Sequence, residues 1–309
     1  MINLRIIFMG TPEFAVPSLE VLVENKYNIV AVVTAPDKPQ GRGQKVTYSP
    51  VKECALKHKI PLLQPTNLKS PEFLEELKSY QADLQVVVAF RMLPEMVWSM
   101  PALGTFNLHA SLLPQYRGAA PINWAIINGE KETGATTFFL KHEIDTGSII
   151  FQVKEPIGDD DDAGRLYERL MKKGAELVLR TVKAIEQNNY ASTPQPDAGD
   201  IKHAPKIFKD TCQINWDQTS EKVRNFVRGL SPYPAAWTTI ESKVFKVYKV
   251  SIVKDAVGNT KAGDLLTDNK TYIRIKTTDG LISLDEIQLE GKKRMTVPEF
   301  FRGNKLVVT

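Results

Sequence analysis

Cysteine and long apolar runs are both scarce in this chain of 309 residues. The two cysteines, Cys54 and Cys212, cannot build a disulfide framework, and neither stands in a spacing typical of a metal site. The run Val86–Phe90 is among the longest apolar stretches and is far too short to cross a bilayer, and no signal peptide opens the chain. We therefore expect a cytoplasmic protein that contacts no membrane and holds no metal.

Several common catalytic motifs are missing too. The first apolar run ends in Met9-Gly-Thr-Pro-Glu13, which contains neither a G-x-G-x-x-G nor a Walker A sequence, so dinucleotide and nucleoside triphosphate chemistry are disfavoured. No G-x-S-x-G elbow surrounds Ser111, and His142-Glu143 lacks the second histidine of a zinc protease. Asp145-Thr-Gly147 has no second copy, as an aspartic protease within one chain would require. These absences leave chemistry that needs neither a metal nor a protein nucleophile.

Composition is that of an ordinary globular protein, with 42% hydrophobic and 25% charged residues, and the length predicts two domains. The net charge of +4 is unevenly distributed. Residues 207–309 hold 17 Lys and Arg against 12 Asp and Glu, whereas the remainder is close to neutral. A polyanionic partner for the C-terminal third is one reading, and an ordinary solvated surface is the other.

The N-terminal part alternates β-branched apolar runs with stretches of helical spacing. The apolar runs are residues 4–9, 29–33 and 84–88, and helical spacing occupies 14–24 and 71–79. This alternation predicts an α/β fold whose parallel sheet is covered on both faces. Such sheets bind their ligands beyond the carboxyl ends of the strands.

The C-terminal part follows a different pattern. Residues 190–206 are rich in proline and polar residues and read as a linker between a domain at 1–189 and another at 207–309. In the latter, a short helix around 223–230 precedes strands at 245–253, 271–276 and 281–289. Within 271–276, isoleucines alternate with Arg274 and Lys276, which predicts a small β-barrel with a basic outer surface.

The most informative segment begins where a short strand at 104–106 leads into Asn107 and His109. Side chains alternate along a strand, so these two share one face. An amide beside an imidazole at a strand end can stabilise an oxyanion and move a proton, which is the equipment of acyl transfer to a nucleophile that the substrate supplies. Asp145 and Arg117 complete one expected pocket. Each residue taken alone has a simpler interpretation. His109 could be a structural histidine and Asn107 could cap a turn. Asp145 could belong to a plain turn and Arg117 could be a surface charge.

A glycine-rich loop at 34–46 follows directly on a strand end. It carries Lys38, Arg42 and Lys45, and Gly41 and Gly43 flank the arginine. Long loops at the ligand-binding edge are usually functional, and this one can reach a nucleic-acid backbone. The alternative is an exposed, solvated loop.

Taken together, these segments are recognisable. The chain resembles the methionyl-tRNA formyltransferase family over essentially its full length. The segments that carry the resemblance are Phe8–Ala15, Ala35–Gly43, Asn107–Pro121, Asp145–Gly147, and Ala204–Ile207 with Trp216. Residues 138–142, Phe-Phe-Leu-Lys-His, depart from the family, because many relatives are richer in methionine there.

The resemblance implies a Rossmann-like parallel-sheet domain, which binds folate and catalyses, followed by an OB-like domain that binds tRNA. It implies transfer of the formyl group of 10-formyltetrahydrofolate to the α-amino group of methionine on initiator methionyl-tRNA, by a monomer without a metal. Asn107, His109 and Asp145 match the catalytic trio. The folate-contacting turn corresponds to Ser111, Leu112, Leu113 and Pro114, and tRNA contacts are expected from Lys38, Arg42 and Lys45.

Two other functions stay open at this point. One is a sugar-nucleotide N-formyltransferase that uses the same donor, since the Asn, His and Asp set indicates only the wider formyltransferase superfamily. The other is a non-catalytic RNA-binding relative that retains the fold.

Overall fold

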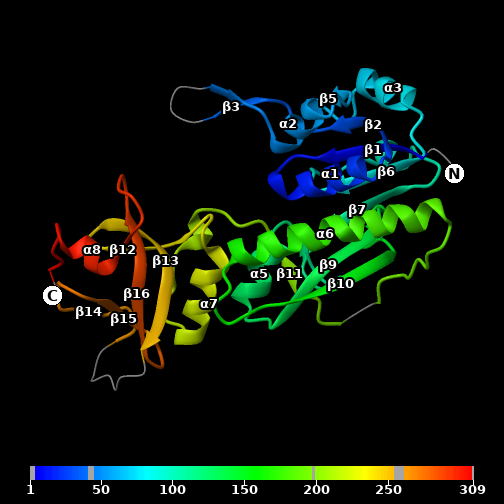
Figure 1. Ribbon diagram of the computed structural model, residues 1–309. Helices are drawn as coiled ribbons and strands as arrows, with labels where there is room; N and C mark the ends of the chain where they lie inside the picture. Colours follow the sequence, from blue (N-terminus) through cyan, green and yellow to red (C-terminus); the bar gives the residue numbers. More distant parts are fainter. Residues whose placement is uncertain (1–3, 41–44, 197–198, 254–260, 308–309) are drawn as a thin grey trace. The chain divides into compact units, whose positions relative to one another are not determined.

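The computed structural model describes residues 4–40, 45–196, 199–253 and 261–307 (Figure 1). Its chain forms two compact units, each assembled from separate stretches of sequence. The first unit comprises 1–118, 134–155 and 167–203, and the second comprises 119–133, 156–166 and 204–309.

A seven-stranded sheet forms the centre of the first unit. Its strands, in spatial order, are β10 (Ile149–Pro156), β9 (Glu132–Phe139), β7 (Thr105–His109), β6 (Leu84–Val88), β1 (Arg5–Gly10), β2 (Asn28–Val33) and β5 (Leu62–Leu63). The five strands from β7 to β5 are parallel, which confirms the predicted α/β fold. Strand β9 runs antiparallel to β7, so the sheet is mixed rather than purely parallel.

The helices described in the first unit are α1 (Val16–Glu24), which continues the 3-10 turn η1 (Glu13–Ala15), α2 (Pro50–Lys57), α3 (Pro71–Ser79), α4 (Glu95–Trp98) and most of α6 (Ala163–Glu186). Two of them, α2 and α3, begin at a side-chain cap. Ser49 and Ser70 accept hydrogen bonds from the N–H of the third residue of α2 and α3, and proline follows each serine. Serine at the N-cap with proline at the first helical position is a strong start signal.

The long helix α6 packs against β7 and β9. A Cβ atom on Gly174 would lie 2.7 Å from Leu108 Cδ2, so the glycine permits close packing of the helix on β7. The hydroxyls of Thr137 and Thr181 are 2.8 Å apart and join β9 to the same helix. None of the helices in the described ranges has the length and apolar character that a membrane span requires.

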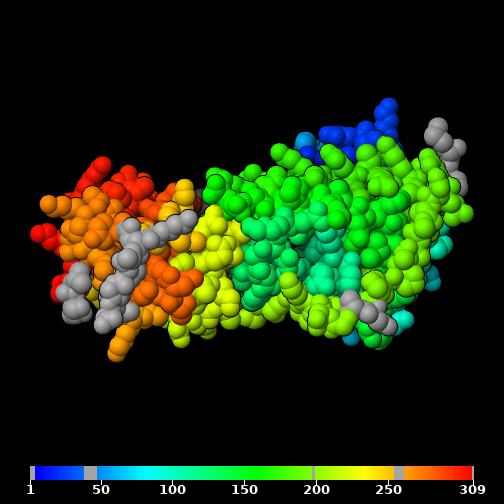
Figure 2. Space-filling view, turned by 90° about the horizontal axis from the view of Figure 1, so that it is seen from below, coloured from blue at the N-terminus to red at the C-terminus, as the bar shows by residue number. Residues whose placement is uncertain are grey.

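The second unit contains a six-stranded antiparallel sheet. Its strands are β12 (Ala236–Ile240), β13 (Lys243–Val253), β16 (Leu281–Leu289), β15 (Ile273–Lys276), β14 (Leu265–Thr267) and β17 (Met295–Thr296). The helices that accompany it are η2 (Asp210–Cys212), α7 (Ser220–Leu230) and α8 (Val297–Phe301). The atoms of this sheet and of α8, orange and red in Figure 2, pack together. The curled antiparallel sheet agrees with the expected OB-like barrel.

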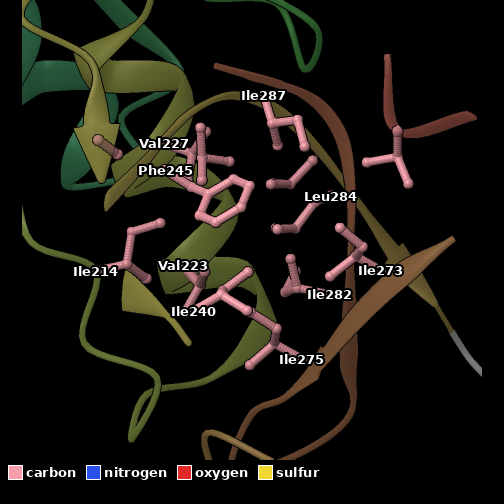
Figure 3. Packing of buried hydrophobic residues seen from close by; sticks show 14 of the residues in the cluster. Ile214, Val223, Val227, Ile240, Phe245, Ile273, Ile275, Ile282, Leu284 and Ile287 are labelled. Atoms are coloured by element: carbon pink, nitrogen blue, oxygen red, sulfur yellow. The ribbon is translucent and has the colours of Figure 1, made fainter. Parts of the chain in front are cut away.

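A hydrophobic core fills the inside of this curled sheet (Figure 3). Phe245 of β13 is 1% exposed and meets the ring of Phe300 edge to face, with centroids 5.5 Å apart. Ile273 and Ile275 are buried while Arg274 and Lys276, which alternate with them, are partly exposed, which confirms the two-faced strand predicted from the sequence.

The second unit also includes α5 (Pro121–Ile127), which lies far from the other elements in sequence. A Cβ atom on Gly229 of α7 would lie 2.6 Å from Ile127 Cγ1, so the two helices approach closely because this residue is glycine. The Asn123 side chain donates to the Gly229 carbonyl at 2.8 Å. Compact packing therefore does not follow the contiguous boundaries at 189 and 206, which stay a prediction about which segments fold by themselves.

Two pairs of short strands, β3 with β4 and β8 with β11, lie outside these two sheets. Strands β3 (Lys38–Gln40) and β4 (Lys45–Thr47) pair in antiparallel register and form a hairpin that extends away from the central sheet (Figure 1). Strands β8 (Arg117–Gly118) and β11 (His203–Ala204) each span two residues.

Truncating Phe245 tests the core of the second unit. Phe245→Ala should destabilise this unit by about 3–5 kcal/mol, because a buried ring is lost and a cavity remains. Val244→Ala on the opposite face of the same strand should cost less than about 1 kcal/mol. Urea unfolding followed by tryptophan fluorescence checks this, since Trp216 and Trp237 pack against the core. Equal unfolding midpoints for the two variants would contradict the assigned packing.

Candidate active site

Strand β7 carries the first two candidate residues at its carboxyl end. Asn107 pairs with Val87 of β6 and Phe138 of β9, and His109 lies opposite Thr136. Leu108 between them packs on α6, so the alternation of side chains directs Asn107 and His109 to the other face of the sheet. Asn107 is half-buried and His109 is 6% exposed. The structure therefore puts the amide and the imidazole side by side, as predicted from the sequence.

A backbone carbonyl fixes the histidine ring. His109 Nε2 lies 2.8 Å from the carbonyl oxygen of Tyr116. Because a carbonyl only accepts, Nε2 carries the proton in this hydrogen bond. The other ring nitrogen, Nδ1, is then the one that can exchange a proton with a neighbour. Tyr116 adopts a left-handed conformation (φ 61°), and its own N–H donates to the Lys202 carbonyl at 2.6 Å.

Asp145 approaches this free nitrogen. Its Oδ2 atom lies 3.8 Å from His109 Nδ1 and accepts a hydrogen bond from the Gly118 N–H at 3.0 Å. Asp145 also has a positive φ of 55°, in the left-handed region that L-residues seldom adopt. The carboxylate and the imidazole, 36 positions apart in the sequence, are thus brought within reach of one proton or one bridging water.

Two contacts hold the turn at 145–147 in place. A Cβ atom on Gly147 would lie 1.5 Å from the Phe139 carbonyl oxygen, so only glycine permits the approach to β9. Gln195 then donates from Nε2 to the carbonyls of Asp145 and Gly147, at 2.7 and 2.9 Å. Its Oε1 accepts from Arg117 Nε and Nη2, at 3.1 and 2.6 Å.

Gln195 is a site residue that the sequence analysis missed. It stands between two prolines within the stretch interpreted as a linker. Nothing in its sequence neighbourhood distinguishes it from other linker residues, because its role depends on folding that brings it to Gly147, 48 positions earlier in the chain. Arg117, which the sequence placed in the pocket, reaches the Asp145 turn through this glutamine.

The turn expected to contact folate is tightly built. Ser111 and Leu113 are buried, with exposed fractions of 0% and 3%, while Leu112 and Pro114 are half-buried. Ser111 Oγ donates to the Gln115 carbonyl at 2.6 Å, which closes the turn. The Ser111 and Leu113 side chains are thus occupied within the fold, so a ligand at this turn would meet backbone atoms and the two half-buried residues.

Polar contacts join the same turn to β9 and β10. Thr136 Oγ1 donates to the Ser111 carbonyl at 2.6 Å and lies 3.2 Å from the Leu113 N–H. Gln152 Nε2 donates to the Leu113 carbonyl at 2.9 Å. The turn is therefore a rigid edge of the pocket rather than a free loop.

Two of the three residues predicted to contact tRNA lie in the described strands of the hairpin. Lys38 begins β3 and Lys45 begins β4, and Arg42 lies outside the described residues. At the base of the hairpin, Lys52 Nζ lies 2.5 Å from Asp37 Oδ2. This hydrogen bond, with a second one from Gln64, holds the pKa of Asp37 below its usual range. The base of the hairpin is thus anchored on α2.

A hollow of about 480 Å³ lies at the opposite edge of the sheet. It is lined by Gln85 and Lys78 among others, near the amino end of β6. Ligands of parallel sheets bind at carboxyl ends, and neither His109 nor Asp145 borders this hollow, so we assign the site to the His109 edge.

Known protein families account for both units. A formyl transferase domain matches residues 4–182, and a formyl transferase C-terminal domain matches residues 206–305. These two matches define the class: a two-domain formyltransferase.

Individual relatives narrow the class. The methionyl-tRNA formyltransferase of Bacteroides fragilis is 54% identical over 309 residues, which cover 97% of this chain and 95% of that protein. The chain belongs to the methionyl-tRNA formyltransferase family.

Solved structures share the fold at lower identity. The N-formyltransferase of Helicobacter canadensis, in complex with folinic acid and dTDP-3-aminofucose, has a TM-score of 0.69 at 23% identity, over 91% of this chain and 98% of that one. HypX of Aquifex aeolicus, in complex with tetrahydrofolic acid, has a TM-score of 0.65 at 19% identity over 98% of this chain. The present chain spans about half of HypX, 48% of its length.

Replacing Gln195 tests its hold on the Asp145 turn. Gln195→Glu keeps the acceptor for Arg117 but loses both N–H donors to the turn, so the amides of 145–148 should exchange with deuterium at least about tenfold faster, which corresponds to the loss of roughly one hydrogen bond. Gln187→Glu, an equal charge change at the exposed end of α6, is the matched control. Unchanged exchange in Gln195→Glu would show that the turn is held by Gly147 alone.

Proposed function

We propose that this protein transfers the formyl group of 10-formyltetrahydrofolate to the α-amino group of methionine on initiator methionyl-tRNA, for translation initiation. The observation that carries this conclusion is 54% identity over nearly the full length to a methionyl-tRNA formyltransferase. The paired His109 and Asp145 at the carboxyl end of β7 supply chemistry that fits it.

In the proposed mechanism, the methionyl amine attacks the formyl carbon and negative charge develops on the formyl oxygen. The Asn107 amide donates to this oxygen. His109 holds its Nε2 proton in the bond to Tyr116, so Nδ1 is the atom that takes up the proton released by the attacking amine. The ring then donates this proton towards the formyl oxygen, and the Asp145 carboxylate, 3.8 Å from Nδ1, stabilises the positive ring. One such donor is typically worth about 3 kcal/mol in the transition state.

Asp145 has a second role in this mechanism. The attacking amine must lose a proton, and N10 of the folate must gain one as it leaves. Asp145 and Nδ1 of His109 lie close enough to pass that proton directly or through one water. No covalent enzyme intermediate forms, and holding two substrates together supplies much of the remaining acceleration.

The other two functions are less well supported. The N-formyltransferase of Helicobacter canadensis, solved with dTDP-3-aminofucose, is only 23% identical to this chain, against 54% for the methionyl-tRNA formyltransferase of Bacteroides fragilis. The trio is complete in this chain, which argues against a non-catalytic relative. We further propose a monomer that acts in the cytoplasm, where aminoacyl-tRNA meets the ribosome.

The catalytic assignment predicts a large loss of rate on changing one residue. His109→Ala should lower turnover by roughly 100-fold or more, with folding intact. His142→Ala is the control, because the His142 side chain is 86% exposed and pairs only with Glu95 in the described part of the chain. The measurement is transfer of labelled formyl from 10-formyltetrahydrofolate to charged initiator methionyl-tRNA, with uncharged tRNA and free methionine as separate acceptors. A rate within a few-fold of the unmodified protein would remove His109 from the mechanism.

The tRNA assignment of the hairpin predicts a separable defect. Arg42→Ala should raise the KM for tRNA and leave folate binding unchanged, because only a phosphate contact is lost. The slope of log affinity against log salt should fall by roughly one for that contact. Lys78→Ala, at the amino edge of the sheet, is the control. An unchanged salt slope in Arg42→Ala would exclude the phosphate contact.

A further inference from the structure

Three potential metal ligands gather in the first unit, outside the site described above. Glu20 lies on α1, Cys54 lies on α2, and His58 caps the C-terminus of α2. One ligand atom from each lies within 4.8 Å of the other two. Cys54 and His58 stand four residues apart, the spacing that places two side chains on one face of a helix.

The histidine of this cluster has an unused nitrogen. His58 Nε2 is buried and has no hydrogen-bond partner among the described residues. Buried polar atoms are nearly always partnered, because an unsatisfied one costs free energy. An unpartnered nitrogen on a residue of this cluster is a second observation that points to a ligand here.

The carboxylate of Glu20 is held facing α2. Lys57 Nζ lies 2.9 Å from Glu20 Oε1 and forms an ion pair with it. A carboxylate has two oxygens, so one remains to bind a cation while the other keeps the lysine. The ion pair therefore orients the carboxylate towards the cysteine and histidine.

Cys54 lies beside the other two ligands and is only 5% exposed. Reactive cysteines are instead accessible to solvent. A buried thiol that faces a carboxylate and an imidazole is better explained as a cation ligand than as a nucleophile.

We propose that Glu20, Cys54 and His58 form a binding site for a divalent zinc ion that joins α1 to α2. Sulfur, nitrogen and carboxylate oxygen are the ligands zinc prefers, whereas magnesium and calcium select oxygen alone. Tetrahedral zinc places its ligands about 3.5 Å apart, so atoms that now lie within 4.8 Å of one another approach by up to about 1.3 Å on binding. Water fills the fourth position.

The sequence analysis predicts no metal, and the sequence carries no signal for the site proposed here. Glu20 and Cys54 are 34 positions apart, and Cys-x-x-x-His alone matches no common zinc pattern. Only the packing of α1 on α2 brings the third ligand into place.

At this location the ion would stabilise the packing of α2 next to the β3–β4 hairpin. Helix α2 begins directly after the β3–β4 hairpin, and Lys52 on its first turn anchors Asp37 at the base of that hairpin. An ion that fixes the other end of α2 to α1 holds the helix on which the hairpin rests. This inference does not depend on the formyl-transfer assignment.

Cobalt titration of the full chain, after chelation of resident metal, tests the site. The unmodified protein should bind one Co²⁺ and show a thiolate-to-cobalt charge-transfer band. Cys54→Ser should lose the band, and both Cys54→Ser and His58→Gln should bind at least about 100-fold more weakly, the upper end of the cost of losing an outer-shell partner. Cys212→Ser, at the other buried cysteine, is the matched control and should behave as the unmodified protein.

Thermal unfolding provides a second readout that separates binding from misfolding. Zinc at a low buffered concentration should raise the unfolding temperature of the unmodified protein and of Cys212→Ser, because the ion binds the folded state. It should leave Cys54→Ser and His58→Gln unchanged. Absence of a thiolate band in the unmodified protein, or the same zinc response in all four proteins, would overturn the proposal.

Discussion

The close approach of the 145–147 turn to strand β9 is the constraint on which the site depends. Gly147 meets the Phe139 carbonyl where no side chain fits, and the Phe139 N–H donates to the Ser148 carbonyl at 3.0 Å. This contact fixes Asp145 beside β7, because β9 is the direct neighbour of that strand. Without it, the carboxylate would be one more charge on a surface turn.

Two backbone positions next to His109 adopt conformations that L-residues seldom take. Tyr116 and Asp145 both have positive φ, and each is held by hydrogen bonds from elsewhere in the first unit. Such conformations cost free energy and persist where the surrounding structure determines them. Here they aim a carbonyl at one ring nitrogen and a carboxylate at the other, so the orientation of the imidazole and its usable nitrogen are set before any substrate binds.

The second unit is organised differently. Its stability comes from a hydrophobic core inside a curled sheet, and its strands expose charged residues on the outer face. Arg228 of α7, 9% exposed, donates to the carbonyls of Gly158 and Asp161, and burial lowers the pKa of its guanidinium. Through such contacts the unit includes segments that lie far before it in the sequence. Its limits therefore differ from the domain boundaries predicted from the composition of the chain.

Much of the fold follows from local pattern alone. The apolar run at 84–88 and the helical spacing at 71–79 coincide with β6 and α3, because continuous burial and a serine cap leave little choice of conformation. The pairing of Asn107 with His109 follows equally from the alternation of a strand.

Roles that depend on contacts between distant segments could not be predicted from local sequence patterns. Gln195 and Glu20 look ordinary in sequence, and each acquires its role only when folding brings it to residues more than 30 positions away. The sequence by itself determined the elements, the strand-end amide and imidazole and the family resemblance, since these depend on neighbours along the chain. The tertiary structure decided which nitrogen of His109 is free, what holds Asp145 and where three dispersed ligands meet, because those depend on packing between elements.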